Sequence, residues 1–424
     1  MKIFLLKGIL KDKSRSLLPI IIVGLGAMLT VLLYSWLKGV IGESIIMNAN
    51  FNTGHVKVIS REQAKTPEQM AIDLSLVNIA ELKKELKKNV SDMDWVERIR
   101  FGSLIDFPDS EGETRAQGPV IGWGLDILSP NTKERERFNL APSIKRGKMP
   151  SKHGEALISE DFAEKFEVKP GDVFTLFGST MEGGMAFQNF TVSGTVKFGA
   201  QVLDRGAIII DIQDAQQAFQ MPDAAGEILG FFNSNLYDTE KAMKVKVKVN
   251  AMFASDTDKY APAAITLQDQ EGMGQYLDYA DAIGGILITI FISAMAIVLW
   301  NSGLLGGLRR YTEFGVRLAL GEDKTHIYVS LLYEAVAIGL IGSLLGSFVG
   351  VLISYWIQQV GIDLGGMMQG STLMMPTVIR TAVTPTTYYI GFIPGVFSIV
   401  IGNALAGIGI YKRSTARLFN ELEV

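Results

Sequence analysis

Residues able to do acid–base, nucleophilic or metal chemistry are few and scattered in this chain of 424 residues. The sequence contains three histidines, His55, His153 and His326, and no cysteine, so thiol catalysis, thiolate metal sites and disulfides are excluded. None of the histidines has a second ligand at the spacing of a zinc site. The pattern therefore predicts three surface or hydrogen-bonded histidines and no metal centre.

Other sequence signals of catalysis are also missing. The acidic run Asp106, Asp109, Glu111 and Glu113 lacks the loop-and-glutamate spacing of a calcium site and is interpreted as a solvated loop. No G-x-S-x-G or S-x-x-K stands at a plausible strand–helix junction. The phosphate-binding pattern G-x-x-x-x-G-K-[ST] does not occur, so no catalytic, cofactor-binding or nucleotide site is expected on this chain.

The composition points to a membrane. Mean hydropathy is positive, at +0.24, although charged residues make up 20% of the chain. That mixture predicts long apolar blocks beside a soluble domain. The formal net charge of −4 argues against a nucleic-acid partner, which would require a basic surface.

Four apolar stretches are long enough to span a bilayer, which takes about 20 residues. They run from about Leu17 to Leu37, Ala282 to Leu305, Ile327 to Ile357 and Tyr388 to Tyr411. A cleaved signal peptide is the alternative for the first stretch, but its apolar core is too long and no clean cleavage pattern follows. We interpret it as an uncleaved anchor.

Basic residues near the ends of the spans predict the orientation. They are Lys2, Lys7, Lys11, Lys13 and Arg15 before the first span, Arg309, Arg310, Arg317 and Lys324 between the second and third, and Lys412, Arg413 and Arg417 after the fourth. Since the number of spans is even, all three clusters fall on one side, and both termini are expected to be cytoplasmic. The block between the first two spans is then outside the cytoplasm.

That external block has the pattern of an α+β domain. Expected strands are Phe51–Ser60, which alternates as a half-buried strand would, and Glu155–Ser159, Asp172–Phe177, Phe190–Val196 and Ala207–Asp211. Expected helices are Ile72–Asn89, Ser159–Phe166 and Asp211–Gln220, while Ala242–Phe253 fits either a helix or a strand. Leu267–Tyr279 is expected to run as a polar helix straight into the second span and form a stalk.

The expected fold class is a membrane protein with four transmembrane α-helices (1+3) and a large α+β extracytoplasmic domain inserted between helices 1 and 2. The expected divisions are a cytoplasmic basic N-terminus 1–16, TM1 17–40, an external domain with stalk 41–281, TM2 282–307, a cytoplasmic loop 308–326, TM3 327–357, a short external loop 358–387, TM4 388–411 and a cytoplasmic tail 412–424.

The loop between the second and third spans predicts a short amphipathic helix. Phe314, Leu318 and Leu320 can share one face, and Glu313 and Arg317 are spaced to pair at i and i+4. Gly321 is expected to end the helix. Taken alone, this pattern fits equally well a membrane-surface helix held by arginine and anionic lipid.

The residues of this loop also resemble those of a known superfamily. They are Glu313, Phe314, Gly315, Val316, Arg317, Leu318, Ala319, Leu320 and Gly321, followed by Leu332-Tyr333-Glu334 at the start of the third span. This pattern resembles the MacB/FtsX/LolC-LolE superfamily of permeases, the type VII or mechanotransmission ABC transporters, and is closest to LolE-like members. The external segment that begins at Gly154 (GEALISEDFAEKFEVKPGDVFTLFG) is similar to the periplasmic domain of that family. Thr312 and Glu322 depart from the family pattern, where an arginine and a small residue are usual.

The resemblance implies a bacterial inner-membrane, multi-pass permease that is not itself an enzyme. The loop would be a coupling helix that docks on a cytoplasmic ABC ATPase dimer, and ATP with Mg²⁺ would bind to that partner. A second permease copy or a paralogue would complete the membrane part, in contact with membrane lipid. ATP-driven motion would then pass through the first two spans to the external domains.

The third span carries Gly342, Gly346 and Gly350 at four-residue spacing. Small residues permit close helix approach in lipid, so we interpret this stripe as a packing face, with substrate contact as the alternative. Glu334 is interpreted as a structural hydrogen-bonding residue that locks the third span to the coupling helix, with proton transport as the alternative. In the fourth span, Gly391, Pro394 and Gly395 predict a kink.

Three functions follow from the resemblance. The first is extraction or translocation of a lipoprotein or another amphiphilic envelope substrate. The second is MacB-like efflux with a periplasmic adaptor and an outer-membrane duct. The third is FtsX-like signalling, in which a periplasmic partner is activated without transport.

Overall fold

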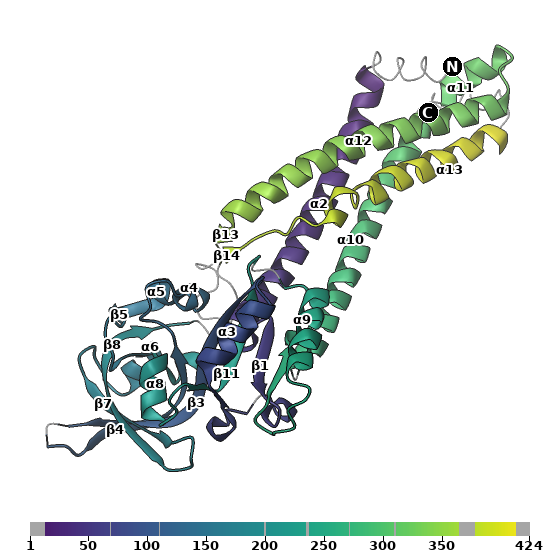
Figure 1. The fold of residues 1–424 in the computed structure, drawn as a ribbon. Helices are drawn as coiled ribbons and strands as arrows, with labels where there is room; N and C mark the ends of the chain where they lie inside the picture. The colour runs from purple at the N-terminus through teal and green to yellow at the C-terminus, as the bar shows by residue number, and fades with distance from the viewer. Residues whose placement is uncertain are drawn as a thin grey trace. The chain divides into compact units, whose positions relative to one another are not determined.

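Long apolar helices and a β-rich domain divide the chain into two units, seen in a computed structural model (Figure 1). The structure describes residues 13–67, 69–109, 111–198, 201–234, 237–270, 272–308, 311–363 and 378–412. Within them, the first unit comprises residues 13–41, 279–363 and 378–412, and the second comprises residues 42–278. The basic clusters at the two ends of the chain fall largely outside the described residues.

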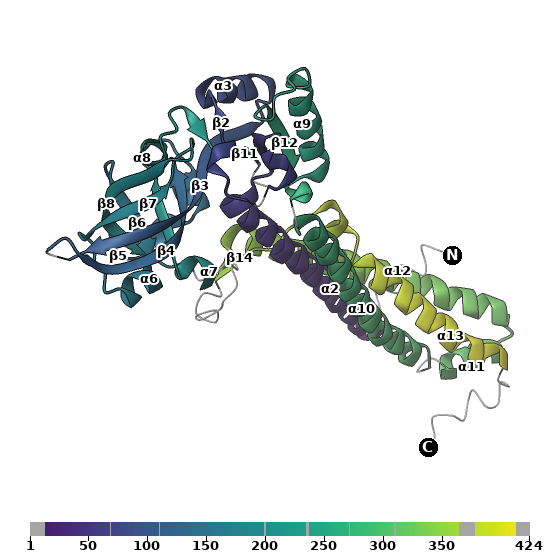
Figure 2. The same ribbon diagram turned by 90° about the horizontal axis from the view of Figure 1, so that it is seen from below.

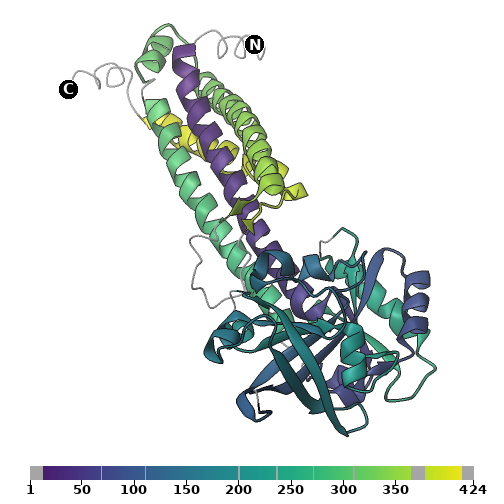
Figure 3. The ribbon, with the colours of Figure 1, turned by 90° about the vertical axis from the view of Figure 1, so that its left-hand side faces the viewer.

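The first unit is a bundle of helices. Its elements are α2 (Lys13–Asn48), α10 (Met273–Leu308), α11 (Tyr311–Ala319), α12 (Lys324–Val360), the short turns η5 (Pro385–Tyr388) and η6 (Ile393–Phe397), α13 (Ser398–Lys412) and the small strand pair β13 (Ile362–Asp363) and β14 (Val378–Ile379). Both α2 and α10 also contribute residues to the second unit. The long helices α2, α10 and α12 run along one another in the view of Figure 3.

Four helical segments among the described residues are long and apolar enough to cross a membrane. They are Leu17–Thr53, Met273–Gly306, Lys324–Val360 and Pro385–Ile408, each overlapping one of the four predicted spans. Large apolar side chains such as Leu25, Ile290 and Phe348 are exposed on their outer faces, as expected where lipid is the solvent. The predicted fold class of four spans and an inserted α+β domain is confirmed.

The second unit is built on strands and short helices (Figure 2). The strands are β1 (Val56–Ser60), β2 (Leu76–Val77), β3 (Met93–Pro108), β4 (Thr114–Leu125), β5 (Ile144–Gly147), β6 (Glu155–Ser159), β7 (Val173–Ser179), β8 (Met185–Val196), β9 (Ala207–Asp211), β10 (Ala224–Ala225), β11 (Glu227–Phe232) and β12 (Pro262–Thr266). The helices and turns are η1 (Ala49–Thr53), η2 (Gln63–Lys65), η3 (Ile72–Leu74), α3 (Ile79–Asn89), α4 (Glu134–Arg137), α5 (Leu140–Ser143), α6 (Glu160–Lys165), α7 (Gln201–Asp204), α8 (Ile212–Ala218), α9 (Thr239–Met252) and η4 (Leu267–Asp269).

Six strands of this unit close into a barrel. Pairing runs from β3 to β4, β9, β6 and β8, and β7 joins β8 back to β3. The interior is filled by aromatic and branched side chains, among them Phe101, Phe107, Phe174, Phe190 and Ile210. A closed barrel satisfies the backbone hydrogen bonds of its strands without leaving an edge.

A second, smaller sheet region shares strand β3 with the barrel. The N-terminal half of β3 pairs with β11, and β11 pairs with β1, which pairs with β12. The C-terminal half of β3 pairs with β4 and β7 of the barrel. Strand β3 therefore joins the two parts of the domain as one continuous element.

Glycines explain why the β3–β4 hairpin is tightly packed. A Cβ atom on Gly122 would lie 2.0 Å from the ring of Phe101, and one on Gly124 would lie 2.6 Å from the Ala215 side chain. Because these glycines have no side chain, Phe101 and Ala215 occupy the space beside them. Strands β3 and β4 were not predicted, and Asp106, which was interpreted as part of a solvated loop, lies within β3.

Three predicted elements need correction. The segment Phe51–Ser60 is not one half-buried strand, since its first residues complete the π-helical turn η1 and the strand β1 is buried on both faces. The predicted helix Ile72–Asn89 is helical only from Ile79 onward. The predicted stalk helix Leu267–Tyr279 is interrupted, because Gly272 has φ +79° and α10 starts at Met273.

The three histidines make local contacts. His55 is buried against Phe231, Phe232 and Tyr237, and its Nδ1 accepts a 3.0 Å hydrogen bond from the Phe232 backbone N–H. His153 contacts Asp214 at 3.1 Å and His326 contacts Glu322 at 2.6 Å. No group of three potential metal ligands occurs in the part of the chain that the structure describes.

Burial, together with the positive charge of Arg137, lowers the pKa of His55 from 6.5 to about 4. A group with a depressed pKa in the folded state takes up its proton more readily when unfolded. The stability that His55 contributes is therefore complete above pH 6.5 and is lost as the pH falls toward 4. The free energy at stake is about 3 kcal/mol, since one pKa unit is about 1.4 kcal/mol.

We predict that His55→Asn, which retains a hydrogen-bond acceptor for the Phe232 N–H, weakens this pH dependence. Thermal unfolding of the purified chain, followed by calorimetry from pH 4 to 7, measures it. The wild-type domain transition should fall more steeply below pH 6.5 than that of the variant. Equal slopes for the two proteins would show that His55 is not the titrating group.

Candidate functional site

Helix α11 is attached to the start of α12 by a compact turn. Gly321 has φ +91°, and the backbone N–H of Glu322 donates to the Arg317 carbonyl at 3.0 Å, which ends the helix as predicted for this glycine. Asp323 caps α12, its side chain accepting from the Thr325 backbone N–H. These contacts hold α11 in a defined position on the bundle.

Two of the predicted apolar residues of α11 face the bundle. Phe314 is buried and packs with Ile327 and Leu331 of α12, and Leu318 is partly buried beside them. Glu313 and Arg317 form the predicted pair, with a nitrogen–oxygen distance of 2.8 Å.

The prediction that Leu320 shares this apolar face is wrong. Leu320 lies after the last residue of α11, and its side chain is 83% exposed. Val316, one turn earlier, is also exposed. The end of the loop therefore presents an apolar surface, formed by Val316, Ala319 and Leu320, that the chain itself leaves uncovered in the described residues.

A cavity of about 590 Å³ lies within the bundle beside α11. Glu313 of α11 and Glu334 of α12 both line it, with Asn301, Ser302 and Asn403 among the other polar lining residues. Glu334 is half-buried. The cavity thus brings together the two carboxylates that the sequence analysis singled out, and a hydrogen bond that locks α12 to the coupling helix stays a prediction.

The glycine stripe of α12 lies against α2. A Cβ atom on Gly346 would lie 2.1 Å from the backbone oxygen of Gly24, and one on Gly342 would lie 2.8 Å from the Val23 side chain. Gly350 meets Val31 in the same way, at 3.0 Å. The two backbones approach so closely that no larger residue fits at Gly346 without moving a helix.

An adjacent face of α12 packs on the irregular start of the fourth span, which also touches α2. Gly391 and Gly395 lie next to the hydroxyl groups of Ser347 and Ser343, at 2.6 and 2.0 Å from the position a Cβ would take. Around Pro394 the chain forms the π-helical turn η6. Proline removes a backbone donor, so the interruption lies where the sequence predicted a kink.

Exposed aromatic side chains gather at one end of the bundle. They are Trp36, Tyr279, Tyr355, Trp356, Tyr388 and Tyr389. They lie near the end of α2, the start of the spanning part of α10, the end of α12 and the start of the fourth span, which the antiparallel order of the spans brings to one side. Such a belt is typical of a membrane–water interface.

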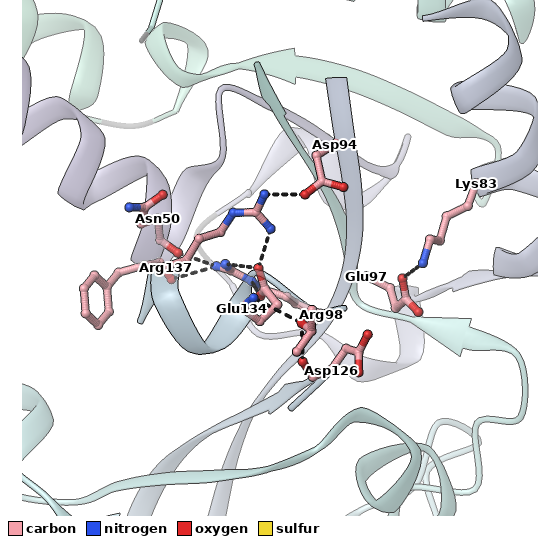
Figure 4. A network of polar contacts seen from close by, with 10 residues as sticks. Asn50, Lys83, Asp94, Glu97, Arg98, Asp126, Glu134 and Arg137 are labelled. Atoms are coloured by element: carbon pink, nitrogen blue, oxygen red, sulfur yellow. Dashed lines mark hydrogen bonds and ion pairs between the residues drawn. The ribbon is translucent and has the colours of Figure 1, made fainter. Parts of the chain in front are cut away.

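The second unit contains a buried ionic network that was not predicted from the sequence (Figure 4). Arg98 of β3 and Glu134 of α4 have fully buried side chains and pair through two bonds, of 2.6 and 3.1 Å. Arg137 donates to Glu134 at 2.8 Å and to Asp94 at 2.5 Å. Arg98 Nη1 also donates to the backbone oxygen of Asn50 at 2.7 Å.

Charge balance explains why this network is stable inside the domain. Burial alone raises the pKa of Glu134, but Arg98 and Arg137 outweigh burial and hold the pKa below its ordinary value. Both guanidinium groups also lie over the ring of Phe231, and Arg98 lies over Phe138. Trp95, Ile99 and Phe101 alternate into the core, which places Arg98 on the other face of β3, so the sequence pattern carries no signal that this residue is buried.

Comparisons with known proteins find similarity over parts of this chain. Residues 285–415 match the family model described as FtsX-like permease C-terminal. The lipoprotein-releasing system transmembrane protein LolC of Xylella fastidiosa (strain 9a5c) is 24% identical over 266 residues, which cover 60% of this chain and 61% of that protein. The macrolide export ATP-binding/permease protein MacB of Psychrobacter cryohalolentis is 28% identical over 115 residues, covering 25% of this chain and 17% of that protein. The extracellular domain of the noncanonic ABC-type transporter YknZ from Gram-positive bacteria covers 50% of this chain and 99% of its own, at 12% identity and a TM-score of 0.34.

The four apolar helices and the matched C-terminal region support an ABC-type permease, a kind of component that is not itself an enzyme. The FtsX-like region and the matches to LolC and MacB support the MacB/FtsX/LolC-LolE superfamily that the loop predicted. Its family and its four apolar helices indicate a bacterial inner-membrane protein. Members of this family work with cytoplasmic ABC ATPases. The chain spans about three fifths of the length of the LolC relatives it matches.

We predict that Gly346→Ala destabilises the bundle by about 1–3 kcal/mol, the usual cost of overpacking. The added methyl group would collide with the Gly24 backbone, which cannot move without shifting α2. Thermal unfolding of the chain in detergent micelles measures the effect. Gly285→Ala on α10 is the matched control, because a Cβ there meets nothing within 4 Å. Equal stability of the two variants would contradict the close α2–α12 contact.

Proposed function

We propose that this permease transmits ATP-driven motion of a cytoplasmic ATPase to its external domain and so releases a lipoprotein or another amphiphile from the outer leaflet. The observation that carries the substrate class is an apolar groove near the aromatic end of the bundle. It has a volume of about 350 Å³ and is lined by Leu29, Leu32, Leu33, Trp36, Phe291, Ile353, Ile357 and Thr381.

The chemistry of this groove suits an acyl chain. Seven of the eight lining side chains are apolar or aromatic, and they come from α2, α10 and α12. Trp36 is part of the aromatic belt, so the groove starts at the level of the lipid head groups and continues into the hydrocarbon. The similarity to LolC, which is named for lipoprotein release, supports the same substrate class.

The surface formed by Val316, Ala319 and Leu320 is proposed to dock on the partner ATPase. Exposed apolar side chains beside charged ones are typical of the core and rim of a protein interface. The family relationship supports an ATPase partner. ATP and Mg²⁺ are proposed to bind to that partner and not to this chain.

A second copy of this chain or a paralogue is proposed to complete the membrane part. Helix α10 is the least covered of the four spans, with apolar residues such as Ile286, Ile290 and Ile297 exposed. Lipid or a second permease would cover that face. Both termini are proposed to be cytoplasmic, on the basis of the basic clusters beside the spans.

Macrolide-type efflux is the second candidate, favoured by the 115-residue match to MacB. In that case a periplasmic adaptor would bind to the external domain, and an acylated substrate would not enter the groove. FtsX-like signalling would need no substrate groove at all. Occupancy of the groove therefore separates the first proposal from the other two.

We predict that Leu320→Asp lowers co-purification of the partner ATPase and ATP-dependent activity at least tenfold. A carboxylate in the centre of an apolar contact would be desolvated without a partner. Pull-down of the ATPase with the tagged permease measures binding. The matched control is Thr325→Asp, at an exposed position in the first turn of α12 beside the same loop. Normal ATPase binding by the Leu320 variant would refute the docking surface.

We predict that a photoreactive residue at Leu29 crosslinks to an acylated lipoprotein in membranes that contain the assembled transporter. The side chain lines the groove, so a bound acyl chain would lie within reach. Mass spectrometry of the crosslinked product identifies the captured species.

The control for this experiment is the same photoreactive residue at Leu25. Leu25 is exposed on the same helix, one turn away, and does not line the groove. Equal capture at both positions would indicate bulk lipid, and capture of nothing acylated at Leu29 would exclude the groove as a substrate site.

A further inference from the structure

The first span ends in the second unit with backbone carbonyls that need donors. Helix α2 continues directly into the π-helical turn η1, and the final carbonyl groups of a helix have no partner within the helix. The backbone N–H of Gly54 satisfies the Ala49 carbonyl at 2.8 Å. The carbonyls of Asn50, Phe51 and Thr53 receive their hydrogen bonds from side chains.

Arg98 supplies the shortest of these bonds. Its Nη1 donates to the Asn50 oxygen at 2.7 Å and lies 3.4 Å from the Phe51 oxygen. The C-terminal end of a helix is electronegative, so a guanidinium group there is favourable by charge as well as by hydrogen bonding. Because Arg98 belongs to strand β3, the cap fastens the end of α2 to the strand that both parts of the domain share.

Glu134 fixes the position of the Arg98 side chain. The carboxylate accepts from Nε and Nη2 in the two-pronged geometry of an arginine–carboxylate pair, which leaves Nη1 directed at the helix end (Figure 4). Neither side chain has exposed surface. A lysine could not hold both contacts, since it offers one ammonium group where arginine offers a planar fork.

The second span is attached differently. Helix α10 begins after Gly272, whose φ of +79° and open surroundings allow the backbone to turn there. Its first turns meet the end of α2 through apolar contacts among Ala49, Leu277 and Met273. A side-chain amide bond from Gln270 to the Thr53 oxygen, 3.3 Å long, is the polar link on this side.

We propose that Arg98, held by Glu134, is the positioning residue through which the first span moves the external domain. The second span, which joins the domain through the segment that contains Gly272, follows the motion of the first. The inference rests on the proposed function, since it names the connection that such a motion would use. Arg98 touches no substrate in this mechanism and acts through α2.

The test uses the full chain with its partner ATPase in lipid nanodiscs. Because the sequence has no cysteine, Gly42→Cys on α2 and Glu182→Cys in the β7–β8 turn can carry two spin labels without side reactions. A Cβ at Gly42 meets nothing within 4 Å, and Glu182 is exposed. Electron spin resonance then gives the distribution of distances between the α2 label and the domain label.

The variant is Arg98→Met with Glu134→Gln, which removes both charges and leaves neither buried alone. We expect its label distances to spread at least twofold in width relative to the parent protein, while ATPase activity stays within twofold. ATP-dependent release of a fluorescent triacylated lipopeptide should fall at least tenfold. Arg98→Lys, which keeps the charge but loses the fork, should give an intermediate width.

The control is Arg146→Met with Glu160→Gln. These side chains form a partly buried ion pair in the same domain, with 37% and 11% exposure and a distance of 2.9 Å. The side chain of Arg146 donates to Glu160 and to the Val168 carbonyl. The label distances of this control should stay narrow and its release of lipopeptide within twofold of the parent, even if both double variants melt at lower temperature.

Two outcomes would overturn the inference. One is a narrow distance distribution in the Arg98 and Glu134 variant, and the other is an equal broadening in the Arg146 and Glu160 control, which would indicate general loosening of the domain. Failure of the proposed function would give a different result, because the parent protein would then release no lipopeptide. The label distances would still broaden in the Arg98 and Glu134 variant and would support the positioning role of Arg98.

Discussion

The contact between the backbones of α2 and α12 is the constraint on which the membrane part depends. In lipid, burial of apolar side chains gives little drive for helix association, so close packing must supply it. Gly24 and Gly346 let the two helices approach until backbone meets backbone. Gly342 and Gly350 extend the same contact by one turn in each direction. The fourth span then packs on a neighbouring face of α12 through glycine and serine.

The second unit depends on strand β3 in the way that the membrane part depends on the α2–α12 contact. One half of it belongs to the closed barrel and the other half to the smaller sheet, so the two parts of the domain share a backbone. Arg98 lies at the junction, at the end of the segment that pairs with β11. Arg98 pairs with Glu134, lies over the ring of Phe138 and donates to the Asn50 carbonyl at the end of the helix. These contacts hold that helix end on strand β3.

Much of the fold could be predicted because its signals are local. Apolar length identified the spans, and strands β6 and β9 follow short apolar runs that end at Ser159 and Asp211, the caps of the next helices. The β3–β4 hairpin was not predicted; glycine is uncommon in strand interiors, and β4 contains Gly118, Gly122 and Gly124. Barrel closure depends on the pairing of β7 with β3, which are far apart in sequence and carry no local mark of each other.

In the candidate site, too, some features could be predicted from the sequence and others could not. The pair Glu313–Arg317 and the stop at Gly321 follow from helix geometry and could be predicted. The direction of Leu320 could not, because helical periodicity no longer applies once the helix has ended. The partner of Arg98 was also beyond prediction, since Glu134 reaches it from a short helix in a separate part of the chain.

Closure of the barrel also limits how other chains can bind to this domain. A peptide that joins a sheet as an additional strand needs a strand edge with unpaired backbone groups. In the ten-stranded sheet of the described residues, the end strands are β12 and β5, and the six barrel strands are paired on both sides. An envelope protein that binds to the doubly paired part of the barrel wall must therefore be recognised by side chains, whereas the end strands β12 and β5 are open to strand addition.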